Sequence, residues 1–326
     1  MNGVVVFAPS PVLTVTIEDH GGRPDIHLHA GGQGVWQARM LVRLGVSVTM
    51  CSVLGGESGQ VLRHLLEDEG VTVRAVEGSG RNGAYIHDRR DGHRVEIAEA
   101  QADPLSRHAL DELYGLTLSA GLDAGAVILS GPASGKVLPA DVYRRLAADL
   151  RATKRHVVAD LAGERLTAVL AGGVTVVKVS DEELLDDGRT QGKDQMEIIR
   201  AMKEMHEKGA GNVIVTRADK PALVLTANTV SEVQMPTLQV ADTHGAGDSL
   251  TAGVAASLAR GGTMTDAVRL GSAAGMLNVT RHGLGTGEVE AVLKLRELVH
   301  MRPVRGGHRD STRVTPRDLA ERLRQR

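Results

Sequence analysis

Aromatic side chains are scarce in this chain of 326 residues, which contains one Trp, one Phe and three Tyr. Valine, leucine and alanine must therefore fill the core of a sequence that is 42% hydrophobic. The same scarcity argues against stacked aromatic surfaces for single-stranded nucleic acid. The charge does not indicate nucleic acid binding either, because 38 basic side chains are balanced by 40 acidic ones, for a formal charge of −2. We therefore expect neither nucleic acid nor a membrane as a partner.

Long apolar runs, a basic leader and paired cysteines are also missing. No apolar stretch approaches the length of a membrane span, and the start Met1–Gly3 lacks the basic residues of a secretory signal. A cytoplasmic location is the expectation that follows. The single cysteine, Cys51, has no partner for an intrachain disulfide, and its apolar context predicts burial.

What the sequence does contain is a regular alternation of short Val/Ile-rich runs and helical patterns. Strands are predicted at Val4–Phe7, Val46–Leu54, Ala126–Leu129, Val157–Ala159, Thr175–Val179 and Val213–Thr216. Helices are predicted near 34–44, 58–69, 106–120, 140–153, 194–208, 247–260 and 264–280. This alternation predicts an α/β fold with parallel strands, right-handed crossovers and helices on both faces of the sheet. Ligands of such sheets bind beyond the carboxyl ends of the strands.

Two regions break the alternation. Val12–Ile17 with Asp25–His29, and Gly83–His87 with His93–Ala98, alternate with a period of two and predict hairpin strands. Together they suit a small β-lid formed by about 12–29 and 83–98, over a domain of residues 1–300. The segment 301–326 is rich in arginine, and we interpret it as a basic, solvated C-terminal extension.

The most informative segment is an acidic, Gly-rich turn that opens an apolar, Ala-rich helix. It reads Asp242-Thr243-His244-Gly245-Ala246-Gly247-Asp248. Small residues let the amides of Gly245, Ala246 and Gly247 converge, and a helix N-terminus adds partial positive charge there, so the turn suits a phosphate. Asp248 then lies beside the anion as a candidate general base, which is what phosphoryl transfer to a hydroxyl requires. The alternative is that Asp248 only caps the helix.

A second Gly-rich turn, Ala30–Gly34, opens an amphipathic helix that is predicted to end at Gly45. At these places in the chain, the two turns resemble the two signature motifs of the PfkB (ribokinase-like) carbohydrate kinases. Further segments extend the resemblance: Ser130–Gly131 with Leu138–Tyr143, Ala159–Glu164, Lys178–Leu184 and Thr280–Gly283. Their order and spacing are most similar to the phosphosugar branch, the 1-phosphofructokinase and tagatose-6-phosphate kinase relatives, over about residues 1–300.

The resemblance implies a ribokinase-like three-layer α/β/α sandwich with a mostly parallel central sheet and a small β-lid. It implies an ATP-dependent kinase that transfers the γ-phosphoryl group to a hydroxyl of a phosphosugar, with Asp248 as the base. ATP and Mg²⁺ are the implied cofactors, and a sugar or sugar phosphate is the implied small-molecule partner. The resemblance also allows a homodimer that forms through the lid.

On the nucleotide side, the resemblance points to Ser180 and Thr243, and to Thr216 and Ala218 in the segment that takes the place of the family's adenine loop. The glycines of that loop are absent here. Glu183 corresponds to the acid that organises water-bound Mg²⁺ in the family, where the metal keeps several waters. The alternative is a helix-starting acid, which the first turn of a helix also favours.

On the acceptor side, Gly31 and Gly32 keep the family pattern. Arg81 matches the position at which phosphosugar kinases hold the substrate phosphate. Charge-assisted hydrogen bonds from such an arginine suit a phosphate.

Other acceptor-side positions depart from the pattern. Thr14 stands where the family has a carboxylate that grips a sugar hydroxyl, and Gln33 stands where it has a lysine. Trp36 replaces an asparagine, either as core filler or as a wall that stacks on the acceptor. Asp242 is expected to position the turn or to contact the substrate.

Three functions therefore stay open at this point. The first is a phosphosugar kinase, and the second is a kinase of a nucleoside or another non-standard alcohol that uses Trp36 for stacking. The third is a catalytically weakened homologue that binds a nucleotide or sugar phosphate. The intact Asp242–Asp248 turn favours an enzyme, because a protein without catalysis has little physical reason to keep it.

Overall fold

The computed structural model describes residues 3–135, 137–218, 220–236, 244–279, 285 and 288–304. Across these residues the main element is a ten-stranded sheet in the order β14-β13-β12-β11-β10-β9-β8-β1-β4-β5. The parallel strands are β5 (Thr72–Gly78), β4 (Val48–Gly55), β1 (Val4–Phe7), β8 (Ala126–Ser130), β9 (His156–Asp160), β10 (Val174–Ser180) and β11 (Ala210–Arg217). An antiparallel extension follows: β12 (Lys220–Thr226), β13 (Thr229–Gln234) and β14 (His300–Pro303). The mostly parallel sheet predicted from the sequence is confirmed.

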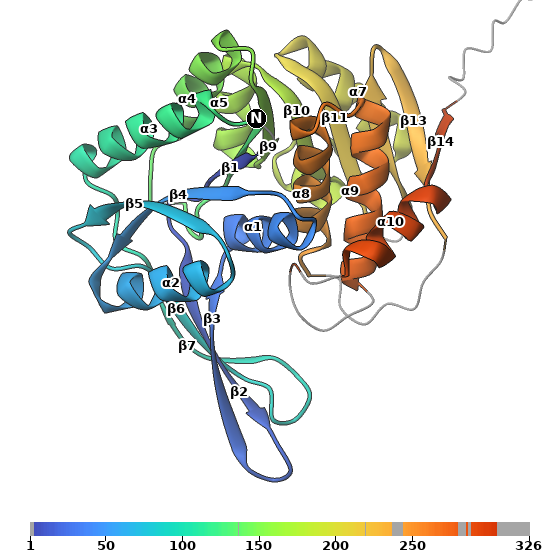
Figure 1. The fold of residues 1–326 in the computed structure, drawn as a ribbon. Coiled ribbons are helices and arrows are strands. Elements are labelled where there is room, and N and C mark those ends of the chain that lie inside the picture. The colour runs from blue at the N-terminus through green and yellow to red at the C-terminus, as the bar shows by residue number, and fades with distance from the viewer. Residues whose placement is uncertain are drawn as a thin grey trace, which may run out of the picture.

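Helices cover both faces of this sheet (Figure 1). One face carries α1 (Gln33–Arg43), α2 (Gly56–Asp68), α8 (Ala246–Ala259), α9 (Met264–Val279) and α10 (Val289–Leu298). The other carries α3 (Arg107–Leu122), α4 (Asp141–Ala152), α5 (Gly163–Gly172), α6 (Asp181–Asp186) and α7 (Gln195–Glu207). The chain therefore has the three-layer α/β/α arrangement that the resemblance implies.

Each face of the sheet has its own hydrophobic cluster, and the central strands supply both. In β1, Val4 and Val6 join the cluster under α1 and α8, whereas Val5 and Phe7 join the cluster under α3 and α4. Strands buried on both faces have continuous apolar sequences, which is why these short runs were predictable. Cys51 is buried in β4 as predicted, and burial raises the pKa of its thiol to about 11.

Small residues allow α8 and α9 to pack closely. A Cβ on Gly253 would lie 2.6 Å from the Cα of Gly271, so the two backbones meet where neither residue has a side chain. The Ala- and Gly-rich composition of α8 thus substitutes for large side chains in a chain poor in aromatics. This packing fixes α8, whose first turn carries Asp248.

The predicted hairpins form a separate four-stranded sheet in the order β3-β2-β6-β7. Its strands are β2 (Val12–Asp19), β3 (Pro24–Gly31), β6 (Ala84–Asp88) and β7 (Val95–Ala100). β2 and β3, and β6 and β7, pair antiparallel, while β2 and β6 pair parallel. Figure 1 shows this lid projecting as an arm from the main sheet.

Several elements were not predicted from the sequence patterns. These are β5, α5, α10 and the antiparallel strands β12 to β14. β14 pairs with β13 and runs three residues beyond the boundary expected at residue 300, while residues 305–326 lie outside the described part of the chain. Among the described residues, every helix is too short or too polar to cross a membrane.

Candidate active site

The last residues of the acidic, Gly-rich turn form the first turn of α8. Gly245 is the N-cap residue, with a φ of 73°, a left-handed conformation that glycine adopts without strain. The helix begins at Ala246, and no side chain caps it. Its first amides therefore have no intrahelical acceptor and are placed to bind an anion. The predicted site residues Asp242 and Thr243 lie outside the described residues.

Asp248 is the third residue of α8, and its side chain is buried. Its Oδ1 accepts a hydrogen bond of 3.3 Å from the side-chain amide of Gln37 in α1. Burial, with a further contribution from the carboxylate of Asp160, raises the pKa of Asp248 to about 8, although Lys178 and Gln37 oppose the shift. A carboxyl group with this pKa exchanges its proton near neutral pH, as a general base must.

A buried ion pair lies beside Asp248. Lys178 Nζ is 3.0 Å from Asp160 Oδ1, and both side chains are almost completely buried. Burial alone would lower the pKa of Lys178, but Asp160, Glu183 and Asp248 outweigh burial and raise it, so the ammonium group stays charged. A Cβ on Gly247 would lie 2.6 Å from Lys178 Nζ, which places this cation against the turn.

These groups meet because strands from different parts of the chain end at one edge of the sheet. Ser130, Asp160 and Ser180 are the last residues of β8, β9 and β10. Thr251 ties α8 to this edge, because its hydroxyl donates a hydrogen bond of 2.8 Å to Asp160 Oδ2. Ligands of parallel α/β sheets bind at this edge.

The other Gly-rich turn lies at the root of the lid. Gly32, with a φ of 102°, precedes α1. The side chain of Gln33 reaches the end of β8, where its Oε1 accepts a hydrogen bond of 2.6 Å from the amide of Gly131. Thr14 lies against the turn, since a Cβ on Gly31 would stand 2.7 Å from Thr14 Oγ1. The structure thus brings together these predicted acceptor-side residues.

Trp36 occupies the first turn of α1 and is half-buried. Among the described residues, it belongs to neither hydrophobic cluster. Its carbonyl faces Gly285, where a Cβ would stand 2.6 Å from the oxygen. The core-filling interpretation therefore lacks support, and its indole remains a candidate wall of the acceptor site.

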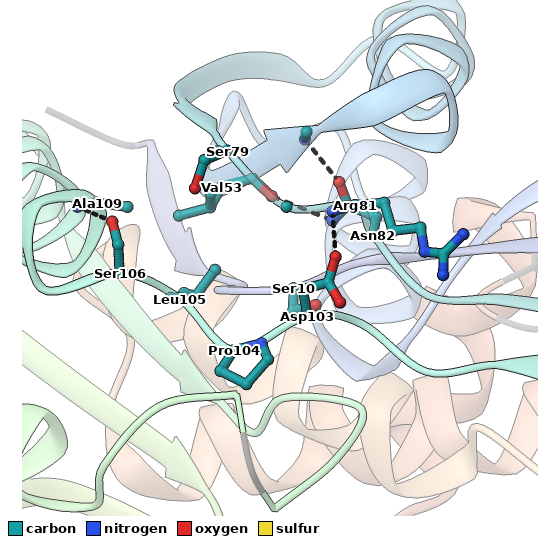
Figure 2. Close-up of a pocket in the computed structure, with 13 residues that line it drawn as sticks. Ser10, Val53, Ser79, Arg81, Asn82, Asp103, Pro104, Leu105, Ser106 and Ala109 are labelled. Carbon is teal, nitrogen blue, oxygen red and sulfur yellow. Dashed lines mark hydrogen bonds between the residues drawn. The ribbon is translucent and has the colours of Figure 1, made fainter.

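Arg81 lies between β5 and β6, at a pocket whose lining includes Ser79, Ser106 and Asp103. Its main chain is fixed, because its N–H donates to Asp103 Oδ2 at 3.0 Å and its carbonyl accepts from the Asp103 N–H at 3.2 Å. In Figure 2 the guanidinium points away from Ser79 and Ser106. It is exposed, and it makes no ion pair within the described part of the chain.

On the nucleotide side, Ser180 and Thr216 are direct neighbours in the register of β10 and β11. Ser180 and Glu183 form a capping box at the start of α6. The Ser180 N–H donates to Glu183 Oε2 at 2.7 Å, and the Glu183 N–H donates to Ser180 Oγ at 3.1 Å. Ala218 directly follows β11 and has a φ of 38°.

Sequence reasoning did not select Gln37, Asp160, Lys178 or Thr251 as site residues. One signal was available, because Asp160 and Lys178 are charged residues in otherwise apolar strands. Burying a charge is costly unless it is paired, so such a residue indicates a partner elsewhere in the fold. The pattern does not say which partner, since Gln37 and Asp248 are 211 positions apart in the sequence.

Comparisons with known sequences and structures show the family to which the chain belongs. The pfkB family carbohydrate kinase model matches residues 12–291. ATP-dependent 6-phosphofructokinase isozyme 2 of Mycobacterium tuberculosis (strain ATCC 25618 / H37Rv) is 27% identical over 291 residues, covering 83% of this chain and 82% of that protein. The 1-phosphofructokinase of Bacillus subtilis is 27% identical over 262 residues, covering 80% of this chain and 84% of that protein.

Solved structures show the same fold. Phosphofructokinase-2 from Escherichia coli in complex with potassium superimposes with a TM-score of 0.81 at 23% identity, covering 91% of this chain and 99% of that one. Ribokinase from Arabidopsis thaliana, complexed with ribose and ATP, gives a TM-score of 0.70 at 22% identity, covering 91% and 99%. The chain therefore belongs to the pfkB family of carbohydrate kinases and is an ATP-dependent sugar kinase.

Proposed function

We propose that the protein transfers the γ-phosphoryl group of ATP to a hydroxyl of a phosphosugar, with Asp248 as the general base. The observation that carries this proposal is the buried Asp248 carboxyl in the first turn of the uncapped helix α8, beside the Lys178 ammonium group. In the step, the acceptor oxygen bonds to the γ-phosphorus, and the bond from that phosphorus to the β–γ bridging oxygen breaks. The hydroxyl proton passes to Asp248, and ADP leaves.

Stabilisation of charge on the transferred group comes from the turn. The amides of Gly245, Ala246 and Gly247 are proposed to donate to the γ-phosphoryl oxygens, as hydrogen-bond donors preorganised for the transition state. Lys178 adds a full positive charge against the same turn, in a buried site where its field is weakly screened. The metal-independent part of the catalysis is thus positioning and electrostatics.

For the acceptor, we propose contacts from two places: the turn that carries Asp248, and the Gly-rich turn where the lid joins the main sheet. Thr14, Gly31, Gly32 and Gln33 adjoin one another there, and Trp36 is proposed as a wall. Asp242 is proposed to contact the acceptor or to position the turn. For the nucleotide, Ser180, Thr216, Ala218 and Thr243 are proposed. Ser180 and Thr216 are direct neighbours on adjacent strands, which supports a common site for these two residues.

Mg²⁺ is proposed to be held through water by Glu183. Among the described residues, no group of three His, Cys, Asp or Glu side chains could hold a metal directly. The capping box uses Oε2 of Glu183, and Oε1 makes no hydrogen bond within the described chain, so it fits an indirect contact with a hydrated ion. When bound, Mg²⁺ would neutralise charge on the phosphate oxygens.

A panel that measures ADP release with hexose phosphates, free sugars and nucleosides tests the acceptor class. Turnover on hexose phosphates alone supports the proposal. The half-buried Trp36 outside both hydrophobic clusters favours one alternative, a nucleoside or other aromatic alcohol. Turnover only on nucleosides would establish that alternative. If ATP binds but no acceptor gives ADP release, the protein would be a binding homologue with weakened catalysis.

Replacing Arg81 by Ala tests the site for the substrate phosphate. The change is expected to raise KM for a hexose phosphate by about tenfold to a hundredfold, since charge-assisted hydrogen bonds contribute about 1.5–3 kcal/mol. KM for the unphosphorylated sugar should stay unchanged. Steady-state kinetics on both sugars measures the effect. Arg63→Ala is the control, because the partly exposed Arg63 of α2 pairs with Glu67 of the same helix. Equal changes for the two sugars would refute the assignment.

We also propose a homodimer that forms through the lid. Ile26, Leu28, Val95 and Ile97 are large apolar side chains on the lid and are 47–59% exposed. In the register of β2 and β3, Ile26 and Leu28 are paired with Ile17 and Val15, so one face of the lid is apolar. Exposed contiguous apolar surface of this kind marks an interaction site.

Replacing Leu28 by Glu tests the dimer. The charge on this face is expected to shift the protein from dimer to monomer, with an increase of at least tenfold in the dissociation constant. Analytical ultracentrifugation over a concentration series measures the shift. Leu122→Glu is the matched control, because Leu122 is 43% exposed on α3, away from the lid. A wild type that stays monomeric at all concentrations, or an unaffected Leu28→Glu dimer, would contradict the proposal.

A further inference from the structure

Gln37 is a completely buried polar residue in the middle of α1, with no exposed surface. Its Nε2 lies 3.2 Å from Asp160 Oδ2 and 3.3 Å from Asp248 Oδ1. An amide nitrogen carries two hydrogens, so it can donate one to each carboxylate. One neutral side chain thus bridges two acids, one on a strand and one on a helix, that lie far from it in the sequence.

The orientation of this amide is fixed by the end of β8. Gln37 Oε1 accepts a hydrogen bond from the hydroxyl of Ser130, and the carbonyl of Ser130 accepts one of 2.8 Å from the hydroxyl of Tyr143. With Oε1 facing a donor, Nε2 must face the two carboxylates, which act only as acceptors when ionised. Ser130 and Tyr143 are buried too, so water does not compete for these bonds.

Asp248 is surrounded by charges from several elements. Asp160 lies on β9, Lys178 on β10 and Glu183 on α6. Two of these neighbours are carboxylates that disfavour ionisation of Asp248, whereas Lys178 favours it. Gln37 also favours the ionised form, because a donor stabilises a carboxylate more than a carboxylic acid.

We propose that Gln37 is a positioning residue, which holds Asp248 as a proton acceptor by donating to its Oδ1 and to Asp160 Oδ2 at once. This inference rests on the proposed role of Asp248 as the base. Within the described chain, Asp248 makes no other hydrogen bond through its side chain, so Oδ2 is left to take the hydroxyl proton. Gln37 itself does not touch the reacting atoms; it orients the base and keeps two like charges apart.

The test is to replace Gln37 by Met, which has a similar length but no hydrogen-bond donor. The midpoint of the rise of kcat with pH is expected to move upward by about one pH unit. At pH 7 kcat should fall about tenfold, and the loss should nearly vanish at the alkaline plateau. Isotope-edited infrared spectroscopy of ¹³C-labelled aspartate should show the same upward move of the Asp248 carboxyl titration, assigned by its loss in Asp248→Asn.

A second variant keeps the proposal testable if Gln37→Met does not fold. Ser130→Ala leaves Gln37 in place but removes the donor to Oε1, and a smaller shift in the same direction is expected. Thr117→Val is the control for a general loss of stability, because Thr117 is a buried residue of α3 whose hydroxyl donates to the Leu113 carbonyl and contacts the Cys51 thiol, neither of which belongs to the site. It should leave the pH midpoint unchanged.

Two results would overturn the role of Gln37: a loss of kcat by the same factor at every pH, or an infrared titration of Asp248 that does not move. The infrared measurement needs no turnover. A shifted Asp248 titration in a protein inactive on every acceptor would therefore uphold the role of Gln37 while removing the proposed function. An unshifted titration in an active kinase would refute the role of Gln37 and leave the proposed function in place.

Discussion

Replacing Asp248 by Asn is expected to lower kcat at least a hundredfold while ATP binding is retained. The amide cannot accept the hydroxyl proton, and general base catalysis contributes about 10²- to 10⁴-fold in rate. The substitution keeps the shape of the side chain, so the amides of the turn should still bind phosphate. ADP release measures kcat, and calorimetric titration of ATP measures binding. Turnover close to that of the wild type would show that the base lies elsewhere.

The pH dependence of the wild type follows from the same group. Because the pKa of Asp248 is raised to about 8, kcat should rise with pH through about 8 and then level off. The raised pKa also means that the folded state binds more protons than the unfolded chain between the ordinary aspartate pKa and about 8. Stability should therefore fall as pH rises through this window.

Asp248→Asn removes that ionisation, so at pH 9 its melting temperature is expected to equal or exceed that of the wild type, with a smaller difference at pH 4. Differential scanning calorimetry at both pH values checks this. Asp111→Asn is the control, since Asp111 is exposed on α3 and should change neither activity nor the slope of stability with pH. A variant less stable than the wild type at pH 9 would contradict a buried carboxylate that is costly to ionise.

Replacing Lys178 by Met is expected to have the second large effect. The change removes the cation that lies against the phosphate-binding turn, and kcat should fall by about 10²- to 10³-fold, as for loss of one strong transition-state donor. It also leaves Asp160 buried without its ion-pair partner. Breaking a buried pair in this way costs about 3–5 kcal/mol of folding stability.

The double variant Lys178→Met with Asp160→Asn separates the two effects. Neutralising Asp160 removes the unpaired buried charge, so much of the stability should return in urea unfolding. Turnover should stay low, because the positive charge beside the turn is still absent. Recovery of both stability and kcat would show that Lys178 serves only to balance Asp160.

The fold was largely predictable because the central strands are buried on both faces. β1, β8, β9 and β10 are apolar runs bounded by helical patterns, and their existence needed no knowledge of their neighbours. β12 was missed although its residues Ala222–Leu225 form a buried apolar run of the same kind. β13 has a more polar sequence, which gives little strand signal until it pairs with β12. β14 was missed for the same reason, since β13 is its pairing partner.

The candidate site was predictable where a single local segment carries it. The turn at Gly245–Asp248 and the turn at Gly31–Gly34 have glycines at positions where the structure has left-handed backbone or no room for a side chain. Arg81 and Thr14 depended on the family resemblance, because a single arginine or threonine does not by itself indicate a ligand.

Local composition by itself determined the layer order, the lid and the helix end that presents Asp248, because strand period, glycine conformation and helix capping act over a few residues. Only the tertiary structure decided the chemistry around that acid. Gln37, Asp160 and Lys178 come from three separate elements and meet at one edge of the sheet. Burial and charge at that meeting point set the pKa of Asp248, and both depend on contacts between residues that are far apart in the sequence.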